Sequence, residues 1–368
     1  MKTKTIWRLA IILAGLACAP ARAEEPVGPL EHDAAWREDH DAGWKAYREA
    51  RLDEAERRLR SAERVARTFG KNDPRLVTTL DHLAWVLCAE GKLGEAESLA
   101  KQALEMQEAS LGPDNPELAK RLNTMACLYD HYGKPEKARP LFERCLALLE
   151  KTKGPNDPGV AAVLDNLAAI AHVQGRVDEA ESLYKRALGV REQNPSAPRF
   201  LAPTLYNLAI LYLEQGKYDQ AETLFRRVVA IREIDLGPDH PALATSLEGL
   251  AWLEYKRGKP AEALPKLKRA MAIFERALGP DDPHVARCYV KEGKICCDSG
   301  EPKEADVFFK EAIRIYEKTA PNDPKALAKV LEDYAAVLRK EGRAAEAKPL
   351  EARARSLREA TGRTAAPK

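Results

Sequence analysis

Apolar residues recur every three or four positions along most of the chain, which is the period of a helix with one buried face. In segment 201–233, Leu205 and Leu208 fall on one side of a first predicted helix. After a short polar turn, Ala221 and Phe225 fall on one side of a second. The pattern therefore predicts a helix–turn–helix unit whose two apolar faces pack together.

This unit is repeated along the chain. A glycine followed five residues later by an alanine occurs seven times, and successive glycines are 41 or 42 residues apart. The pairs are Gly91/Ala96, Gly133/Ala138, Gly175/Ala180, Gly216/Ala221, Gly258/Ala263, Gly300/Ala305 and Gly342/Ala347. An earlier copy has Ala50 in place of the glycine and Ala55 at the alanine. The spacing predicts eight units of about 42 residues.

Small residues mark where the two helices of each unit are expected to touch. A glycine or alanine stands seven residues before each turn glycine, or before Ala50. These residues are Gly43, Ala84, Ala126, Ala168, Ala209, Ala251, Gly293 and Ala335. Two helices cross at close range only where the side chains at the contact are small.

A second kind of turn separates one unit from the next. The hexapeptide LGPDHP at 236–241 has near-copies at 111–116, 153–158 and 278–283, and weaker ones at 70–74 and 320–324. Its glycine suits the end of a helix, and the last proline suits the first turn of the next. The residue before that proline is an expected N-cap. It is His240 in one copy and otherwise Asp73, Asn115, Asp157, Asp282 or Asp323.

Prolines also mark the second helices. Pro135, Pro260 and Pro302 follow the turn glycines by two residues and are expected in a first helical turn. Three further prolines lie about five residues deeper, where we expect a small kink or a late helix start: Pro140, Pro265 and Pro349.

The unit resembles the tetratricopeptide repeat, and its 42-residue form with LGPDHP and QGKYDQAETLFRRVVAIRE resembles the kinesin light chain subtype. The resemblance covers residues 31–361. It implies an all-α fold, a right-handed α-solenoid of eight stacked helix pairs with the first helices along the concave side. In that family an extended peptide or a partner's helix binds the concave groove.

The resemblance also implies which residues contact a partner. In the kinesin light chain form, asparagines of an LNNLA motif bond a peptide backbone, and this chain has Asn123, Asn166 and Asn207 in similar motifs. The alternative is that they bond neighbouring helices or water. For Trp85 and Trp252 the alternative is partly buried packing. The predicted partner-binding residues are Trp85, Asn123, His131, Asn166, His172, Tyr206, Asn207, Ile210, Trp252 and Tyr255.

Composition and charge narrow the function. The chain is 45% hydrophobic and 32% charged, with 59 basic and 57 acidic residues and no block of like charge, so nucleic-acid binding has no support. No zinc-protease motif, phosphate-binding glycine loop or nucleophile elbow occurs. We therefore expect no catalytic residue, no metal site and no cofactor.

Residues 1–23 have the pattern of a signal peptide, with a basic start, an apolar stretch and a small-x-small site at Ala21 to Ala23. This predicts a bacterial protein that is exported, periplasmic or secreted. Cys18 follows a sequence that loosely resembles a lipobox, so a lipid tether to a membrane is an open alternative. Residues 24–30 are expected to form a linker and 362–368 a disordered tail.

Six cysteines remain after the signal: Cys88, Cys127, Cys145, Cys288, Cys296 and Cys297. Their spacing fits no zinc pattern. They are expected either to pack as small core residues or to form disulfides, which export would permit.

These observations predict a scaffold that binds a peptide or a segment of a partner protein in its concave groove, in the bacterial cell envelope. The alternative is a protein that binds a small molecule or a cell-wall fragment in a pocket between repeats.

Overall fold

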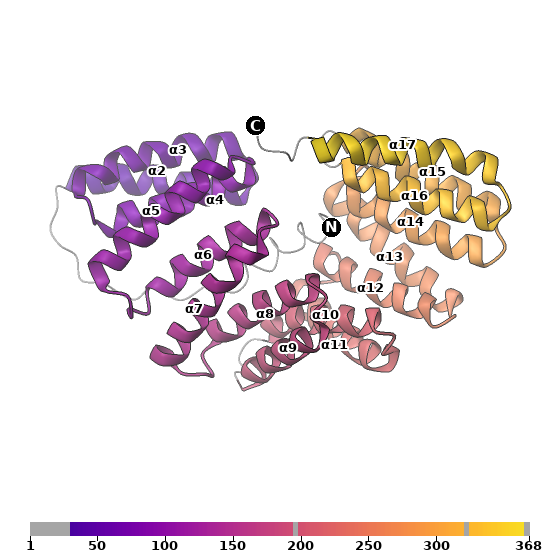
Figure 1. Ribbon diagram of the computed structural model, residues 1–368, viewed down its shortest axis with the longest axis horizontal. Helices are drawn as coiled ribbons and strands as arrows, with labels where there is room; N and C mark the ends of the chain where they lie inside the picture. Colours follow the sequence, from indigo (N-terminus) through magenta and orange to yellow (C-terminus); the bar gives the residue numbers. More distant parts are fainter. Residues whose placement is uncertain (1–29, 194–197, 320–323, 364–368) are drawn as a thin grey trace. The chain divides into compact units, whose positions relative to one another are not determined.

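The computed structural model describes residues 30–193, 198–319 and 324–363, which form α-helices, two 3₁₀ helices and short connections (Figure 1). The predicted signal peptide, Cys18 and Asp323 lie outside these residues. In the described ranges the sixteen α-helices are α2 Leu30–Arg48, α3 Leu52–Ala66, α4 Pro74–Ala89, α5 Leu93–Leu111, α6 Leu118–His131, α7 Pro135–Lys153, α8 Pro158–Val173, α9 Val177–Glu192, α10 Leu201–Glu214, α11 Tyr218–Leu236, α12 Pro241–Lys256, α13 Pro260–Leu278, α14 Pro283–Asp298, α15 Pro302–Thr319, α16 Pro324–Lys340 and α17 Ala344–Arg363.

The helices pack in consecutive pairs, α2 with α3, α4 with α5 and so on to α16 with α17. This confirms the eight predicted helix–turn–helix units. The 3₁₀ helices η1 Arg67–Phe69 and η2 Pro198–Phe200 lie in connections between pairs. No described helix is both long enough and apolar enough to cross a membrane.

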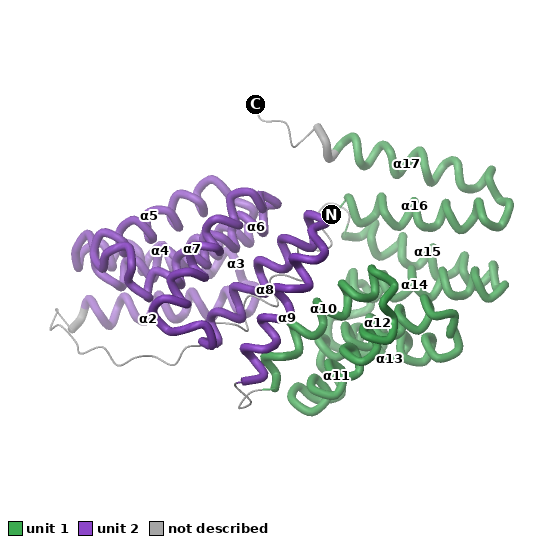
Figure 2. Tube along the Cα trace, turned by 60° about the horizontal axis from the view of Figure 1, so that its bottom comes forward, with its two compact units in different colours: residues 1–7, 196–368 green, residues 8–195 purple. Residues whose placement is uncertain are grey.

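The chain divides into two compact units, one of residues 8–195 and one of residues 1–7 with 196–368 (Figure 2). The described part of the first contains α2–α9, and that of the second contains α10–α17. In each, the second helix of a repeat packs on the first helix of the next, as α3 does on α4 and α11 on α12. Each unit is therefore an α-solenoid of four repeats.

The small residues lie where the sequence predicts, at the contact between paired helices. The alanine five residues after each turn is fully buried in all eight repeats. A Cβ added to Gly43 would lie 2.8 Å from Leu59 Cγ, and one added to Gly293 would lie 2.8 Å from Phe309 Cε2. The paired helices therefore approach too closely at these points for a larger residue.

The turns between repeats end and start helices as expected, except before α6. That helix begins at Leu118 with Glu117 as its N-cap, so the predicted cap Asn115 lies outside it, and its side chain accepts a 2.9 Å bond from the nitrogen of Glu117. Gly237 has a φ of 85°, which closes α11. Asp157 and Asp282 cap α8 and α14 by accepting a backbone N–H bond of 2.8 Å from the residue two positions on. His240 caps α12 in the same way, its Nδ1 lying 3.1 Å from the nitrogen of Ala242. This bond needs a neutral ring, because a protonated Nδ1 cannot accept.

The prolines of the second helices behave differently at their two positions. Helices α7, α13 and α15 begin at Pro135, Pro260 and Pro302, as predicted. The expected late start was wrong, because α7, α13 and α17 already run through their deeper prolines. These prolines are exposed, so water can reach the carbonyl groups that lose a helical partner. They are Pro140, Pro265 and Pro349.

Second helices of neighbouring repeats are joined by ion pairs that recur at one spacing. An arginine contacts a glutamate 36 residues earlier, across α5–α7, α7–α9, α11–α13 and α15–α17. The pairs are Arg144–Glu108, Arg186–Glu150, Arg269–Glu233 and Arg353–Glu317.

The cysteines pack inside the repeats. All six described cysteines are free thiols, and five are buried. Cys145 donates to the carbonyl oxygen of Ala119 at 3.2 Å, and burial raises the pKa of its thiol to about 12. This arrangement is that of small core residues, the first of the two alternatives.

Candidate partner-binding surface

Two of the predicted partner-binding residues meet on α12, where the rings of Trp252 and Tyr255 have centroids 4.9 Å apart. Three lysine ammonium groups surround the Trp252 ring, at 5.1 Å for Lys256, 5.5 Å for Lys291 and 5.8 Å for Lys294. Cations within about 6 Å of an indole face are attracted to it. We call these five residues the Trp252 surface.

Carboxylates beneath the surface hold two of the lysines. Lys291 Nζ lies 2.8 Å from the buried Glu248 on α12, and Lys294 Nζ lies 2.9 Å from Asp333 on α16. Lys256 makes no direct ion pair with any described residue. The three first helices α12, α14 and α16 therefore position the lysines, and one lysine remains available to an incoming carboxylate.

Glu248 is the electrostatic centre below the lysines. Its two oxygens accept from the guanidinium of Arg287 at 2.6 and 2.5 Å. Burial alone would raise the pKa of Glu248, but Arg287 and Lys291 outweigh burial and lower it to about 2. The carboxylate is therefore ionised at neutral pH, and the pair fixes α14 against α12.

The predicted residues of α10 are half-buried. The Tyr206 ring packs edge-on against Phe225 at 5.7 Å, with the guanidinium of Arg232 at 5.3 Å. Burial raises the pKa of Tyr206 to about 12. Tyr206 thus packs against the second helix of its repeat and is also partly exposed. Asn207 and Ile210 are half-exposed on the same helix.

In the unit of residues 8–195, two predicted asparagines meet each other. Asn123 on α6 is only 7% exposed, and Asn166 Nδ2 on α8 lies 3.5 Å from its Oδ1. This contact corresponds to the alternative in which the asparagines bond neighbouring helices. Asn123 has little surface left for a partner.

The other predicted residues of this unit are Trp85, His131 and His172. Trp85 on α4 is half-buried against the cores of two successive repeats. His131 ends α6 and meets the ring of Tyr132 edge-on at 5.4 Å. His172 is half-buried on α8.

The sequence analysis missed a column of rings on α2 and α4. Trp36, His40, His82, Trp44 and Tyr47 stack in that order, with centroid separations of 4.8, 4.9, 3.9 and 4.9 Å. His40 Nε2 and His82 Nδ1 are 2.9 Å apart. The missed signal was spacing, since the four members on α2 lie three or four residues apart along one helix face.

The lysines of the Trp252 surface were also missed. Lysine is common on exposed helix faces, so its presence in the sequence carries little information. Only the register of α12 against α14 brings the three ammonium groups to one ring.

A hollow of about 660 Å³ opens beside η1 and α5. Its lining mixes charged and apolar side chains, among them Arg67, Lys71, Glu105 and Met106. Its lining residues come from successive repeats, so it corresponds to the kind of pocket that the small-molecule alternative requires.

The sequence profile described as Tetratricopeptide repeat matches five segments of the chain: residues 46–109, 86–151, 133–193, 200–276 and 253–318. The chain belongs to the tetratricopeptide repeat family. Its eight helix pairs are eight tetratricopeptide repeats, and the surfaces above lie largely on their first helices. A search of curated proteins finds no match.

Solved structures with this fold include kinesin light chain-like proteins. BtubC (BKLC) from P. vanneervenii is 24% identical with a TM-score of 0.51, over 68% of this chain and 94% of that one. The tetratricopeptide-like repeats of a putative kinesin light chain from Podosopora anserina are 25% identical, over 55% of this chain and 96% of that one, with a TM-score of 0.47. The apo form of the quorum sensor NprR from B. thuringiensis is 15% identical with a TM-score of 0.69, over 97% and 98%.

Proposed function

We propose that this tetratricopeptide repeat protein is a non-catalytic scaffold that holds a segment of a protein partner against the first helices of its repeats. We further propose that it acts in the bacterial cell envelope after export. Membership of a repeat family supports the first part, because stacked repeats leave an extended surface of first helices available to a partner. The pattern of residues 1–23 supports the second.

The observation that carries the proposal is the convergence of three lysines on Trp252. A half-buried tryptophan offers apolar contact area, and the lysines beside it offer charge. A partner segment that suits this surface carries a carboxylate next to an apolar or aromatic side chain. Lys256 is the residue that would receive the carboxylate, because Lys291 and Lys294 already have carboxylate partners.

Site-specific photocrosslinking in cells tests the scaffold role. A crosslinker at Ile210 or Trp252 should capture one specific protein, whereas one at Arg226, exposed on the second helix α11, should not. The Ile210 crosslink should weaken at least about tenfold on Lys256→Glu, the cost of about one lost charge pair in a desolvated contact. Equal capture from Arg226, or an Ile210 crosslink unaffected by Lys256→Glu, would refute the proposal.

Mass spectrometry of the protein recovered from a bacterial envelope fraction tests export. A mature chain that begins at Glu24 is the expected result. A diacylated N-terminal Cys18 would instead establish the membrane tether. Recovery of the intact chain from the cytoplasm alone would contradict both.

The hollow beside η1 favours a second candidate, the binding of a small molecule. Met106→Trp would fill this space without touching the Trp252 surface. If Met106→Trp abolishes function and Lys256→Glu does not, the small-molecule role replaces the scaffold role.

A further inference from the structure

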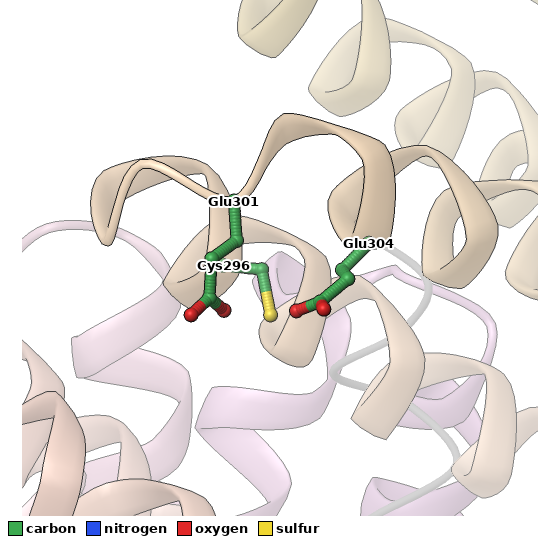
Figure 3. A group of neighbouring side chains, drawn as sticks. All are labelled: Cys296, Glu301 and Glu304. Atoms are coloured by element: carbon green, nitrogen blue, oxygen red, sulfur yellow. The ribbon is translucent and has the colours of Figure 1, made fainter.

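The turn of the seventh repeat gathers three potential metal ligands. Cys296 lies near the end of α14, Glu301 follows the turn glycine Gly300, and Glu304 stands in the first turn of α15. Their ligand atoms all lie within 4.8 Å of one another. In Figure 3 the Cys296 sulfur lies between the two carboxylates, and all three side chains point to one place. We call these residues the Cys296 cluster.

Glu301 breaks a charge pattern that the other repeats share. The residue after the turn position is basic in the other seven repeats: Arg51, Lys92, Lys134, Arg176, Lys217, Lys259 and Arg343. In four of them it pairs with a glutamate three residues later, as Lys259 does with Glu262 at 3.0 Å. The seventh repeat keeps this glutamate as Glu304 but replaces the cation with a second carboxylate. A positive charge is therefore missing at this turn.

A third acid, Glu292, reinforces this shortage of positive charge. It stands one helical turn before Cys296, so the two side chains share a face of α14. Glu292 is 1% exposed, and its Oε2 makes no hydrogen bond. The equivalent position is uncharged in all other repeats: Ala42, Leu83, Met125, Leu167, Leu208, Leu250 and Tyr334. A buried carboxylate oxygen without a hydrogen bond is costly, so a cation near this face of α14 would lower the cost.

A lysine of α13 supplies only part of the missing positive charge. Lys268 attracts both Glu292 and Glu304 but forms no direct ion pair with either among the described residues.

We propose that the Cys296 cluster is a binding site for a borderline-soft divalent cation of the Zn²⁺ type, with Cys296, Glu301 and Glu304 as ligands and Glu292 as a third, buried carboxylate on the same face of α14. A thiolate beside carboxylates suits Zn²⁺ or Co²⁺, whereas Mg²⁺ and Ca²⁺ prefer oxygen ligands alone. A coordinating thiol must lose its proton, so binding releases that proton to solvent and affinity rises with pH. The ion would fasten α14 to α15 at their turn.

Titration of the full chain with Co²⁺ under reducing conditions tests this site. Thiolate ligation to Co²⁺ gives a near-ultraviolet charge-transfer absorption that carboxylates alone do not give. We expect this band to saturate at one equivalent and to disappear when Zn²⁺ is added in competition. Cys296→Ala should abolish it, and Ala171 at the same position of the fourth repeat shows that the fold accepts alanine there.

Two further variants make the test specific. Glu301→Lys restores the cation of the other repeats, so it should fold normally and weaken Co²⁺ binding at least tenfold. Cys297→Ala is the matched control, since Cys297 points to Glu341 instead of the cluster, and it should keep the band. No thiolate band, a band that survives Cys296→Ala, or unchanged affinity in a helical Glu301→Lys variant would each overturn the proposal.

Discussion

At the scale of the residue, close helix contacts are set by missing side-chain atoms. In α14 a Cβ on Gly293 would meet Phe309 at 2.8 and 2.9 Å. Gly293→Ala should therefore lower the free energy of unfolding by about 1–2 kcal/mol, because overpacking outweighs the helix propensity of alanine. Urea unfolding measures the difference.

Gly189 provides the control for this change. It also lies inside a helix, but nothing comes within 4 Å of an added Cβ. Gly189→Ala should raise stability by about 0.5–1 kcal/mol. The same sign for both variants would contradict the close-contact explanation.

Ala50 is a position where glycine should be more stable than alanine. It takes the place of the turn glycine in the first repeat and has a φ of 57°, which strains any residue with a Cβ. Ala50→Gly should raise the melting temperature, with a gain of about 1 kcal/mol. A loss of stability would mean that the first turn differs from the others.

Glu248 tests the charge network beneath the Trp252 surface. Glu248→Gln leaves Arg287 and Lys291 without their buried counter-charge and should cost about 2–3 kcal/mol of unfolding free energy. Glu233→Gln, which breaks an exposed pair with Arg269, should cost at most about 0.5 kcal/mol. Chemical denaturation of both variants distinguishes a buried network from ordinary surface pairs.

The sequence predicts residue roles unevenly. The small residues could be predicted because a glycine or alanine occurs at the same position in all eight repeats. The three lysines could not, because each is common on an exposed helix and only helix register brings them together. The ring column could be predicted in part, since the spacing of its members on α2 is visible in the sequence but the contact with His82 of α4 is not. The Cys296 cluster lay within reach, since Glu301 is the one acidic residue at a position otherwise basic.

At the scale of the element, most helix boundaries follow from the capping and turn residues at their ends. The caps Asp157 and Asp282 and the closing glycines act as predicted. The prolines of the turns between repeats start their helices with one exception, Pro116, which lies before the start of α6 at Leu118. The deeper prolines did not delay the start of their helices, because they lie on exposed faces where water can replace the lost helical bond.

The ring column joins α2 to α4 and makes their packing sensitive to pH. Burial holds the pKa of His82 well below its ordinary 6.5, and the neighbouring charges of His40, Lys120 and Arg121 lower it further. Burial also lowers the pKa of His40, although Asp41 acts in the opposite direction. The unfolded chain therefore binds more protons below about pH 6.5, and stability falls as pH decreases through that value. The loss is at most about 1.4 kcal/mol per pH unit and histidine.

Urea unfolding at about pH 7.5 and pH 5 measures this effect. The variant His82→Phe keeps a ring in the column but cannot titrate, so it should lose less stability between the two pH values than the natural chain. An equal loss in both proteins would place the acid sensitivity elsewhere.

At the scale of the whole molecule, the eight repeats form two groups of four. The sequence predicts the repeats but not this division. The boundary is nevertheless marked, because the connection around Pro195 is the one place after the first repeat where no GPDHP-like turn separates successive units.

Each group buries its own core, and repeat stability is largely a sum of contacts between neighbours. The fragment 196–368 should therefore fold alone into a helical domain with cooperative thermal unfolding. Circular dichroism of the purified fragment checks this. A fragment that is unfolded while the full chain is helical would show that the two groups depend on each other.

The recurring arginine–glutamate pairs have a consequence for how such a chain changes in length. The two partners of each pair are 36 positions apart in the sequence, which is less than the length of one repeat. A gene duplication that copies one whole repeat therefore recreates the same pair at the new junction, whereas an insertion of any other length separates the partners. The protein can therefore be lengthened by whole repeats during evolution, because each added repeat brings the residues for its own contacts.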